Sequence, residues 1–470
     1  MRFSATQTAE QLLAPPVYRR MRPLTQMVDA AWQGSDEAAV ARRMSLIAFA
    51  IRIVSAAIAF FSQVVLARWT GTFDYGIYVF VWTTMIILGS LSCFGFQTAV
   101  IRFLPMYRRQ EDFDRLRGLL LASRLFVFIS ASIVAAAGIG LVLLLGERIE
   151  SYYVVPFILA FTCLPMLSLG DVLDGTARAN SWPVRALTPT YILRPLLLLC
   201  FMAAAHIAGF AASAATAVIA AVLATFSTAL LQLVIVTRNL DALYPPGPRK
   251  TDMAPWMKVA VPIFLVEGFF FLLTNADVLM VGLYMRPDDV AVYYATVKTL
   301  ALVHFVFFAV KAGVAQEFAA RSGAGERDSL QTFARQTVRW TFWPSLLMGA
   351  AVLLLGKFLL GLFGAEFAAG YPFLFILVAG VVLRASIGPA ESLLNMTGNQ
   401  NICAVIFAAV LALNVVLNMI LIPRYGLFGA ATATAAATLV EAGLLMFVVH
   451  RRVGVLMFVF APSKPGEATV

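Results

Sequence analysis

Long apolar stretches alternate with short polar ones along most of this 470-residue chain. A helix needs about 20 mostly apolar residues to cross the hydrocarbon core of a bilayer. Within lipid, a helix satisfies its backbone hydrogen bonds inside one segment of that length. Twelve stretches qualify: 44–68, 77–100, 119–145, 153–175, 187–207, 211–237, 258–284, 291–314, 338–363, 371–394, 401–422 and 428–450. The pattern therefore predicts an all-α polytopic membrane protein with about twelve transmembrane helices.

Composition agrees with this prediction. The chain is 61% hydrophobic and 13% charged, whereas soluble domains average about 45–50% and about 25%. The net charge of +10 comes from short basic clusters between apolar stretches, so it predicts no nucleic-acid binding. All four cysteines lie inside apolar stretches, where they act as small hydrophobic residues and not as a disulfide framework or metal site.

Basic residues also predict the orientation in the membrane. The polar segments on the side of the N-terminus hold 22 Lys and Arg residues, and those on the other side hold 3. Because Lys and Arg accumulate on the cytoplasmic side, both termini are expected in the cytoplasm. The first 43 residues contain no apolar core of signal-peptide type, and they are expected to form either a basic amphipathic surface stretch or a tail.

A proline-rich segment at residues 238–257 predicts a cytoplasmic linker between two halves. The halves are residues 44–237 and 258–450, flanked by cytoplasmic segments 1–43 and 451–470. A shift of about 215 residues places Tyr78 on Tyr293 and Phe103 on Phe318. Six helices per half make the halves parallel repeats, so we expect two lobes related by pseudo-twofold symmetry, with substrate bound between them.

Charged side chains inside the apolar stretches are the candidates for function. The stretch 258–284 carries Glu267, Asn275 and Asp277, and two central carboxylates oppose insertion by about 5–7 kcal/mol. Such a helix is stable when its acids face protein or water. Either the acids fix helix packing or they lie on a transport pathway.

The basic side chains in these stretches differ in depth. Arg52 and Lys298 lie deep, whereas three others lie within about two turns of a cytoplasmic end, from which a long side chain can reach the interface. Those three are Arg124, Arg194 and Lys311. Arg and Lys in a cavity favour an anionic head group such as a diphosphate. A buried carboxylate in the second half favours a coupling ion, H⁺ or Na⁺.

The chain has no sequence motif of a catalytic site. It contains no nucleotide-binding loop and no His, Cys or carboxylate cluster with metal-ligand spacing. We therefore expect a secondary transporter without a cofactor, and no enzyme.

Several segments together resemble a known family. FSQVVLARWTGTFDYGIYVFVW (61–82), GFQTAVIRFLPMY (95–107), GKFLLGLFGAEFAAGYPFL (356–374), LNMTGNQN (394–401) and LNVVLNMILIPRYGLFGAATAT (413–434) occur in this order. They resemble the bacterial polysaccharide flippases, the O-antigen and exopolysaccharide translocases of the superfamily that also contains multidrug extrusion (MATE) proteins. The resemblance implies a MATE-like fold in the bacterial cytoplasmic membrane. It also implies movement of an undecaprenyl-diphosphate-linked oligosaccharide to the outer leaflet by ion-coupled alternating access, without chemistry on the sugar.

The resemblance also implies site residues and partners. The cationic lumen would contain Arg52, Arg102, Arg124 and Lys298, with Arg102 equally explained as an anchor at the cytoplasmic mouth of its span. Asp277 matches the acid of the family's seventh helix and is expected to couple the ion. Glu267 has no such match and is specific to this protein, but as a second acid of the same stretch it is also expected to take part in coupling. The expected partners are the lipid-linked oligosaccharide, membrane lipids, and the polysaccharide polymerase and chain-length proteins.

Two other functions remain open. One is a cation-coupled multidrug antiporter of the same fold, although a pump for cationic drugs should present acids in its first half, where the deep charges are Arg52 and Arg124. The other is a subunit of a polysaccharide synthesis complex that transports nothing. Lipid II flippases of the superfamily usually carry two more C-terminal helices, so we expect a different substrate.

Overall fold

The computed structural model describes residues 37–146, 148–323 and 327–461, and within these ranges every regular element is a helix. Nine of the described helices are long and apolar enough to cross a membrane, or ten if one bent pair counts as a single span. Two of them turn back on themselves, α3 (Glu37–Ser92) at Gly71 and α16 (Gln400–Val453) at Gly426. The described chain therefore makes twelve passes, which confirms the all-α polytopic prediction.

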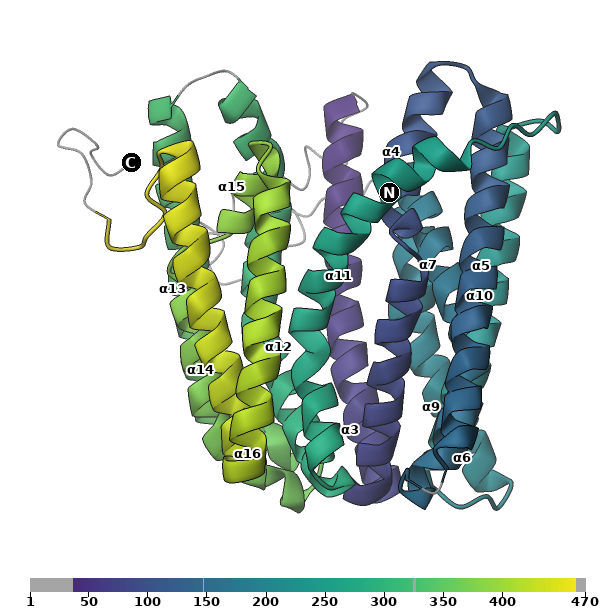
Figure 1. Ribbon diagram of the computed structural model, residues 1–470, viewed down its shortest axis with the longest axis vertical. Coiled ribbons are helices and arrows are strands. Elements are labelled where there is room, and N and C mark those ends of the chain that lie inside the picture. Colours follow the sequence, from purple (N-terminus) through teal and green to yellow (C-terminus); the bar gives the residue numbers. More distant parts are fainter. Residues whose placement is uncertain (1–36, 147, 324–326, 462–470) are drawn as a thin grey trace, which may run out of the picture.

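The helices form two groups, which we call the N-lobe and the C-lobe (Figure 1). The N-lobe comprises α3, α4 (Phe96–Arg109), α5 (Phe113–Leu144), α6 (Ser151–Phe161), α7 (Leu164–Ala179), α8 (Pro183–Thr188), the π-turn η1 (Pro189–Leu193), α9 (Arg194–Ile207) and α10 (Ala214–Leu243). The C-lobe comprises α11 (Met253–Tyr284), α12 (Pro287–Gly323), α13 (Arg327–Gly361), the 3₁₀ turn η2 (Ala365–Gly370), α14 (Tyr371–Ala385), α15 (Ala390–Met396) and α16.

Three of the predicted continuous spans are broken. The second pass is interrupted between α3 and α4, where Gly95 has a left-handed φ of 80°. The fourth pass bends by 46° between α6 and α7. The tenth stops at Ala385 and resumes as α15 after a turn in which Gly388 has φ 58°. Hydropathy alone predicts unbroken helices because each turn takes up only a few residues inside a long apolar stretch.

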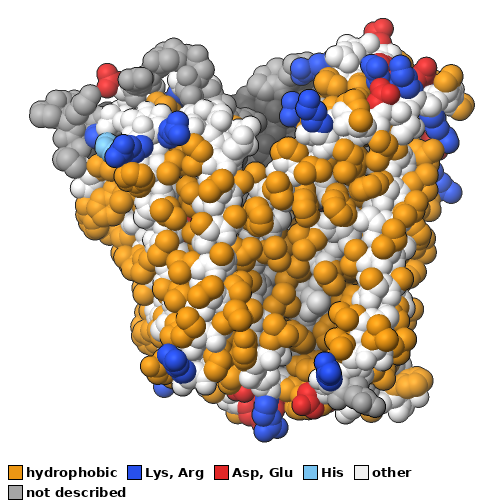
Figure 2. Space-filling model, viewed as in Figure 1, with side chains coloured by type: hydrophobic (Ala, Val, Ile, Leu, Met, Phe, Trp, Pro, Cys, Tyr) orange, Lys and Arg blue, Asp and Glu red, His pale blue; other side chains and the backbone are white. Residues whose placement is uncertain are grey.

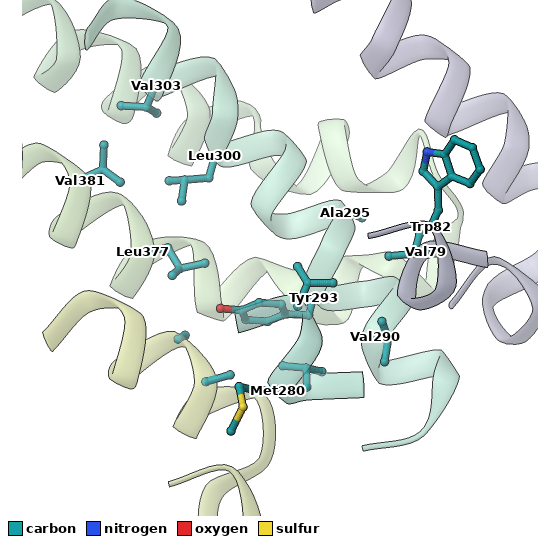
Figure 3. Packing of buried hydrophobic residues seen from close by; sticks show 14 of the residues in the cluster. Val79, Trp82, Met280, Val290, Tyr293, Ala295, Leu300, Val303, Leu377 and Val381 are labelled. Carbon is teal, nitrogen blue, oxygen red and sulfur yellow. The ribbon is translucent and has the colours of Figure 1, made fainter. Parts of the chain in front are cut away.

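The lobes meet mainly where α3 of the N-lobe packs against α11 and α12 of the C-lobe, at the centre of the molecule (Figure 1). At the end opposite the start of α3 and the end of α16, which we call the distal end, the lobes join in a continuous surface (Figure 2). At the other end, where α3 starts and α16 ends and which we call the termini end, the helices of the two lobes diverge (Figure 1). Buried Val79 and Trp82 of α3 lie beside Val290 and Ala295 of α12 (Figure 3).

The start of α11 is anchored in the N-lobe. Trp256 is fully buried in the N-lobe core, and its Nε1 donates to the hydroxyl oxygen of Tyr107 over 2.9 Å. Gly95 permits this approach, because a Cβ there would lie 2.3 Å from the carbonyl oxygen of Ala260. The first turns of α11 thus belong to the N-lobe core although α11 continues into the C-lobe.

The proposed linker and the proposed C-terminal segment both contain residues that belong to the folded lobes. Helices extend into the proposed linker 238–257 from both sides, which leaves residues 244–252 as its loop. After α16, Val455, Met457 and Val459 are buried, and the Val459 N–H donates to the Ser386 carbonyl over 2.9 Å. Residues 454–461 therefore pack on the C-lobe, while residues 1–36 and 462–470 of the proposed terminal segments lie outside the described residues.

Candidate functional site

A cavity of about 320 Å³ lies between the lobes. Its walls come from both passes of α3, from η1, α9 and α10, and from α12 of the C-lobe. Most of the lining is apolar or aromatic, as in binding sites for organic ligands. The polar and aromatic lining residues are Phe60, Ser62, Gln63, Tyr78, Trp82, Thr190, Tyr191, Arg194, Tyr294, Lys298 and Phe305.

Two basic residues face this cavity from opposite lobes, Arg194 at the start of α9 and Lys298 on α12. The Lys298 Nζ lies 4.7 Å from the centre of the Tyr294 ring, a cation–π distance. Among the described residues, neither side chain has a hydrogen bond or ion-pair partner. Asp171 lies within electrostatic range of Arg194, and Asp277 within that of Lys298, but neither carboxylate forms an ion pair with its cation. The cavity therefore presents two cations that no carboxylate contacts directly.

Aromatic side chains form the N-lobe wall beside these cations. The rings of Tyr78 and Trp82 stack with centroids 6.1 Å apart and an interplanar angle of 10°. Residues four apart share one face of a helix, so α3 presents this stack as one surface. Further along the same face, the Tyr75 hydroxyl donates to the cavity-lining Gln63 Oε1 over 3.0 Å.

Of the four predicted lumen cations, the cavity lining includes Lys298 alone. Arg52 is exposed on α3, within electrostatic range of Asp174, and Arg102 is exposed on α4. Arg124 lies on α5 inside the N-lobe, where its Nη1 donates to Thr237 Oγ1 over 3.1 Å. The structure thus does not bring these four residues together.

Arg194 is the cavity residue whose role the sequence left undecided. The predicted span began at residue 187, which placed Arg194 about two turns from its end. In the structure, helical residues start at Pro183, one further turn away. The sequence signal was an arginine inside an apolar stretch, and its depth was underestimated.

The two predicted coupling acids occupy separate places. Asp277 is buried in the C-lobe, where its Oδ2 accepts from the Tyr293 hydroxyl over 3.1 Å and its Oδ1 accepts from the Val278 N–H over 2.9 Å. Glu267 lies on the exposed side of α11, and its two oxygens accept from Thr98 Oγ1 of α4 over 3.1 and 2.8 Å. Asp277 is therefore a C-lobe core acid, whereas Glu267 bridges the lobes.

The C-lobe also contains a buried network of two cations and two carboxylates. Arg384 donates through Nε to Glu441 over 2.9 Å and through Nη2 to Glu391 over 2.8 Å. The other oxygen of Glu391 lies 3.1 Å from Lys311 Nζ. Buried charges are stable when paired, so this neutral set is a structural feature of the C-lobe. All four residues lie inside predicted apolar stretches, but the sequence does not reveal that they pair.

Among the described residues, no group of three or more His, Cys, Asp or Glu side chains is placed to hold a metal ion. The candidate site is the interlobe cavity, with Arg194, Lys298 and an aromatic wall in its lining.

Comparisons with known proteins agree with this architecture. Residues 42–315 match the family model described as "Polysaccharide biosynthesis protein", and residues 262–420 match the model described as MatE. Among proteins with curated functions, none matches the chain in sequence.

Solved structures share the fold at low sequence identity. An inward-facing multidrug resistance MATE family transporter has a TM-score of 0.65 at 14% identity, covering 86% of this chain and 94% of its own. The lipid II flippase MurJ, in an inward closed conformation, has 0.66 at 15% identity, covering 86% and 87%. A MOP superfamily transporter from Pyrococcus furiosus, described as having a binding pocket of reversed polarity, has 0.63 at 15% identity, covering 91% and 98%.

Proposed function

Because this chain belongs to the polysaccharide biosynthesis protein family of the multidrug/oligosaccharidyl-lipid/polysaccharide exporter superfamily, we propose that it is a flippase for lipid-linked oligosaccharide. The substrate is an undecaprenyl-diphosphate-linked O-antigen or exopolysaccharide repeat unit. It moves from the inner to the outer leaflet of the bacterial cytoplasmic membrane by alternating access, with both termini of the protein in the cytoplasm. A polysaccharide polymerase and chain-length proteins act on the exported unit.

One observation supports the substrate assignment: Arg194 and Lys298 face one cavity from different lobes, and the carboxylates within electrostatic range, Asp171 and Asp277, form no ion pair with them. A cation in a site of low dielectric is costly unless it is paired, and a diphosphate supplies the missing negative charge. Guanidinium and ammonium groups make charge-assisted hydrogen bonds to phosphate oxygens. The stacked rings of Tyr78 and Trp82 offer an apolar face beside them, which suits the C–H face of a sugar.

Asp277 is the proposed coupling site for H⁺ or Na⁺. Its carboxylate is buried and has hydrogen-bond donors but no ion-pair partner among the described residues. A carboxylate of this kind is stabilised by a bound cation or proton. Glu267 contributes at the lobe boundary, through its contact with Thr98.

The test is flipping in proteoliposomes. The purified protein is reconstituted with a fluorescent undecaprenyl-diphosphate oligosaccharide, and the fraction cleaved by an external glycosidase is followed with and without a proton or sodium gradient. Arg194→Ala and Lys298→Ala are each expected to lower the rate at least tenfold. Lys357→Ala is the matched control, because Lys357 Nζ also lies over a tyrosine ring, 5.3 Å from Tyr371, but outside the cavity.

The MatE match supports a second candidate, a cation-coupled multidrug antiporter. Two unpaired cations in the cavity would repel a cationic drug. Uptake of a cationic dye without oligosaccharide flipping would nevertheless establish the antiporter and refute the flippase. Absence of both activities in vesicles that contain folded protein would favour a subunit of a synthesis complex that transports nothing.

A further inference from the structure

The distal end of the interlobe contact is built around the bend in α3. Arg68, just before Gly71, donates through Nε to the Leu362 carbonyl over 2.5 Å and through Nη2 to the Gly361 carbonyl over 3.2 Å. Gly361 is the last residue of α13. The last carbonyls of a helix lack intrahelical donors and carry partial negative charge. Arg68 of the N-lobe therefore caps the end of a C-lobe helix.

A second polar contact lies just after the same bend. Thr72 Oγ1 donates to Glu366 Oε2 of η2 over 2.8 Å. Gly71 has φ 78° and ψ 170°, a left-handed backbone that favours glycine. The bend thus places Arg68 and Thr72 together against the segment that follows α13.

Close backbone packing continues beside these hydrogen bonds. At Gly76 of α3, a Cβ would lie 1.8 Å from the carbonyl oxygen of Pro287, the first residue of α12. No side chain fits there unless the helices separate. The ring of Phe60 packs on Phe363 with centroids 5.4 Å apart, which adds an aromatic contact between α3 and the end of α13.

We infer that these contacts are a distal latch, defined as Arg68, Thr72 and Gly76 with the C-lobe groups they meet. The latch holds the lobes together at the distal end while they diverge at the termini end. It opens when the cavity is exposed to the distal side. The inference rests on the proposed transport function for its role in the cycle, while its effect on conformation is measurable without substrate.

The chemistry of the latch suits repeated opening. Arg68, Thr72 and Glu366 make contacts at exposed positions, so water can replace each lost hydrogen bond and its net contribution stays modest. A buried charge network such as that of Arg384 and Glu391 would instead leave orphaned charges when parted. The distal contact is therefore strong enough to bias one conformation without preventing the other.

The test measures the distance between the lobes at the distal end. Spin labels are attached at Ser151→Cys and Tyr425→Cys, both exposed at the distal end on different lobes, in a Cys200→Ser background. The other cysteines, Cys93, Cys163 and Cys403, are buried. Electron–electron double resonance in lipid nanodiscs then gives the ratio of separated to joined distal ends.

Arg68→Ala is expected to raise this ratio about tenfold, because the hydrogen bonds to the carbonyls of Gly361 and Leu362 are lost. Gly76→Ala should also raise the ratio, because the added Cβ would collide with the Pro287 carbonyl oxygen of α12. Alanine is favourable within a helix, so α3 itself should not be destabilised. The matched controls are Arg286→Ala, an exposed cation also at the distal end, and Gly140→Ala, a helical glycine with open space around its Cβ position. Both should leave the ratio unchanged.

Wild-type distance distributions in both Arg68→Ala and Gly76→Ala, in monodisperse protein, would overturn the latch. That result would leave the proposed function standing if the wild-type protein flips oligosaccharide. Conversely, a raised ratio in both variants together with no flipping by any form would support the latch and refute the flippase.

Discussion

Replacing Arg384 by methionine removes the cation at the centre of the C-lobe charge network. Arg384 is 9% exposed and donates to Glu391, to Glu441 and, over 2.9 Å, to the Gly388 carbonyl. In its absence Glu391 keeps Lys311, whereas Glu441 is left without a partner. Breaking a buried ion pair by removing one partner costs about 3–5 kcal/mol. Since native proteins are stable by about 5–15 kcal/mol, the variant should lose a large share of its stability.

If the lost stability comes from the unpaired Glu441 carboxylate, removing that carboxylate as well should restore it. Removing Glu441 together with Arg384, as in Arg384→Met/Glu441→Leu, leaves Lys311 and Glu391 as a neutral pair 3.1 Å apart. Exchanging a buried ion pair for apolar residues of similar volume is often neutral or stabilising. The double variant should therefore recover most of the loss, a non-additivity typical of residues in one network.

The assay is thermal inactivation of the purified protein in detergent, followed as the fraction that remains in the monodisperse peak of a size-exclusion column. The midpoint temperature of inactivation should be highest for the wild type, lower for the double variant and lowest for Arg384→Met. Lys357→Met removes an exposed cation from the same lobe and should stay near wild type. A double variant no more stable than Arg384→Met would refute the charge-balance reasoning.

Three further perturbations test other parts of the structure. Asp277→Asn should make flipping independent of the ion gradient because a neutral amide neither releases a proton nor balances a cation, and unchanged gradient dependence would contradict the coupling role. Gly118→Ala places a Cβ 1.9 Å from the Lys250 carbonyl oxygen, so it should displace loop 244–252 and lower the free energy of unfolding by about 1–3 kcal/mol. Protease cleavage in this loop should then be faster than in the wild type, and equal cleavage rates would contradict the prediction. Val459→Pro removes the N–H that donates to the Ser386 carbonyl and should release residues 454–461 from the C-lobe. Carboxypeptidase should then remove a C-terminal tag faster than from the wild type, and an unchanged rate would argue against this packing.

The number of membrane passes could be predicted from the sequence because apolar length alone determines whether a helix can cross lipid. The breaks could not. Gly95 and Gly388 adopt left-handed backbone angles within apolar runs, where a hydropathy average records only a small residue. A glycine in a helical pattern is a weak signal, because many glycines of this chain, such as Gly140, remain helical.

A residue of the candidate site can be predicted from the sequence only where both its depth in the membrane and the helix face that it occupies are determined. Arg52 and Lys298 were both predicted to lie deep, but Lys298 lines the cavity whereas Arg52 is exposed on α3, so depth alone did not separate them. Arg124 is equally a cation in an apolar helix, but α5 is apolar nearly all round, and the sequence of such a helix does not reveal which face meets which neighbour. The structure turns Arg124 toward Thr237 within the N-lobe. Arg194 needed the observed start of its helix before its depth was apparent.

The cavity and the distal latch share two helices, α3 and α12, so movement at one is transmitted to the other. Tyr75 of α3 is fully buried, and its ring contacts Tyr294 at 6.2 Å and Phe367 of η2 at 6.0 Å. Tyr294 in turn supports Lys298 in the cavity. Closely packed interiors respond to displacement by switching between discrete arrangements, because they deform little. An anion that draws Lys298 toward Arg194 would therefore shift Tyr294 and repack Tyr75 against Phe367, beside Glu366 of the latch. The link between binding and opening thus requires only side chains that already touch.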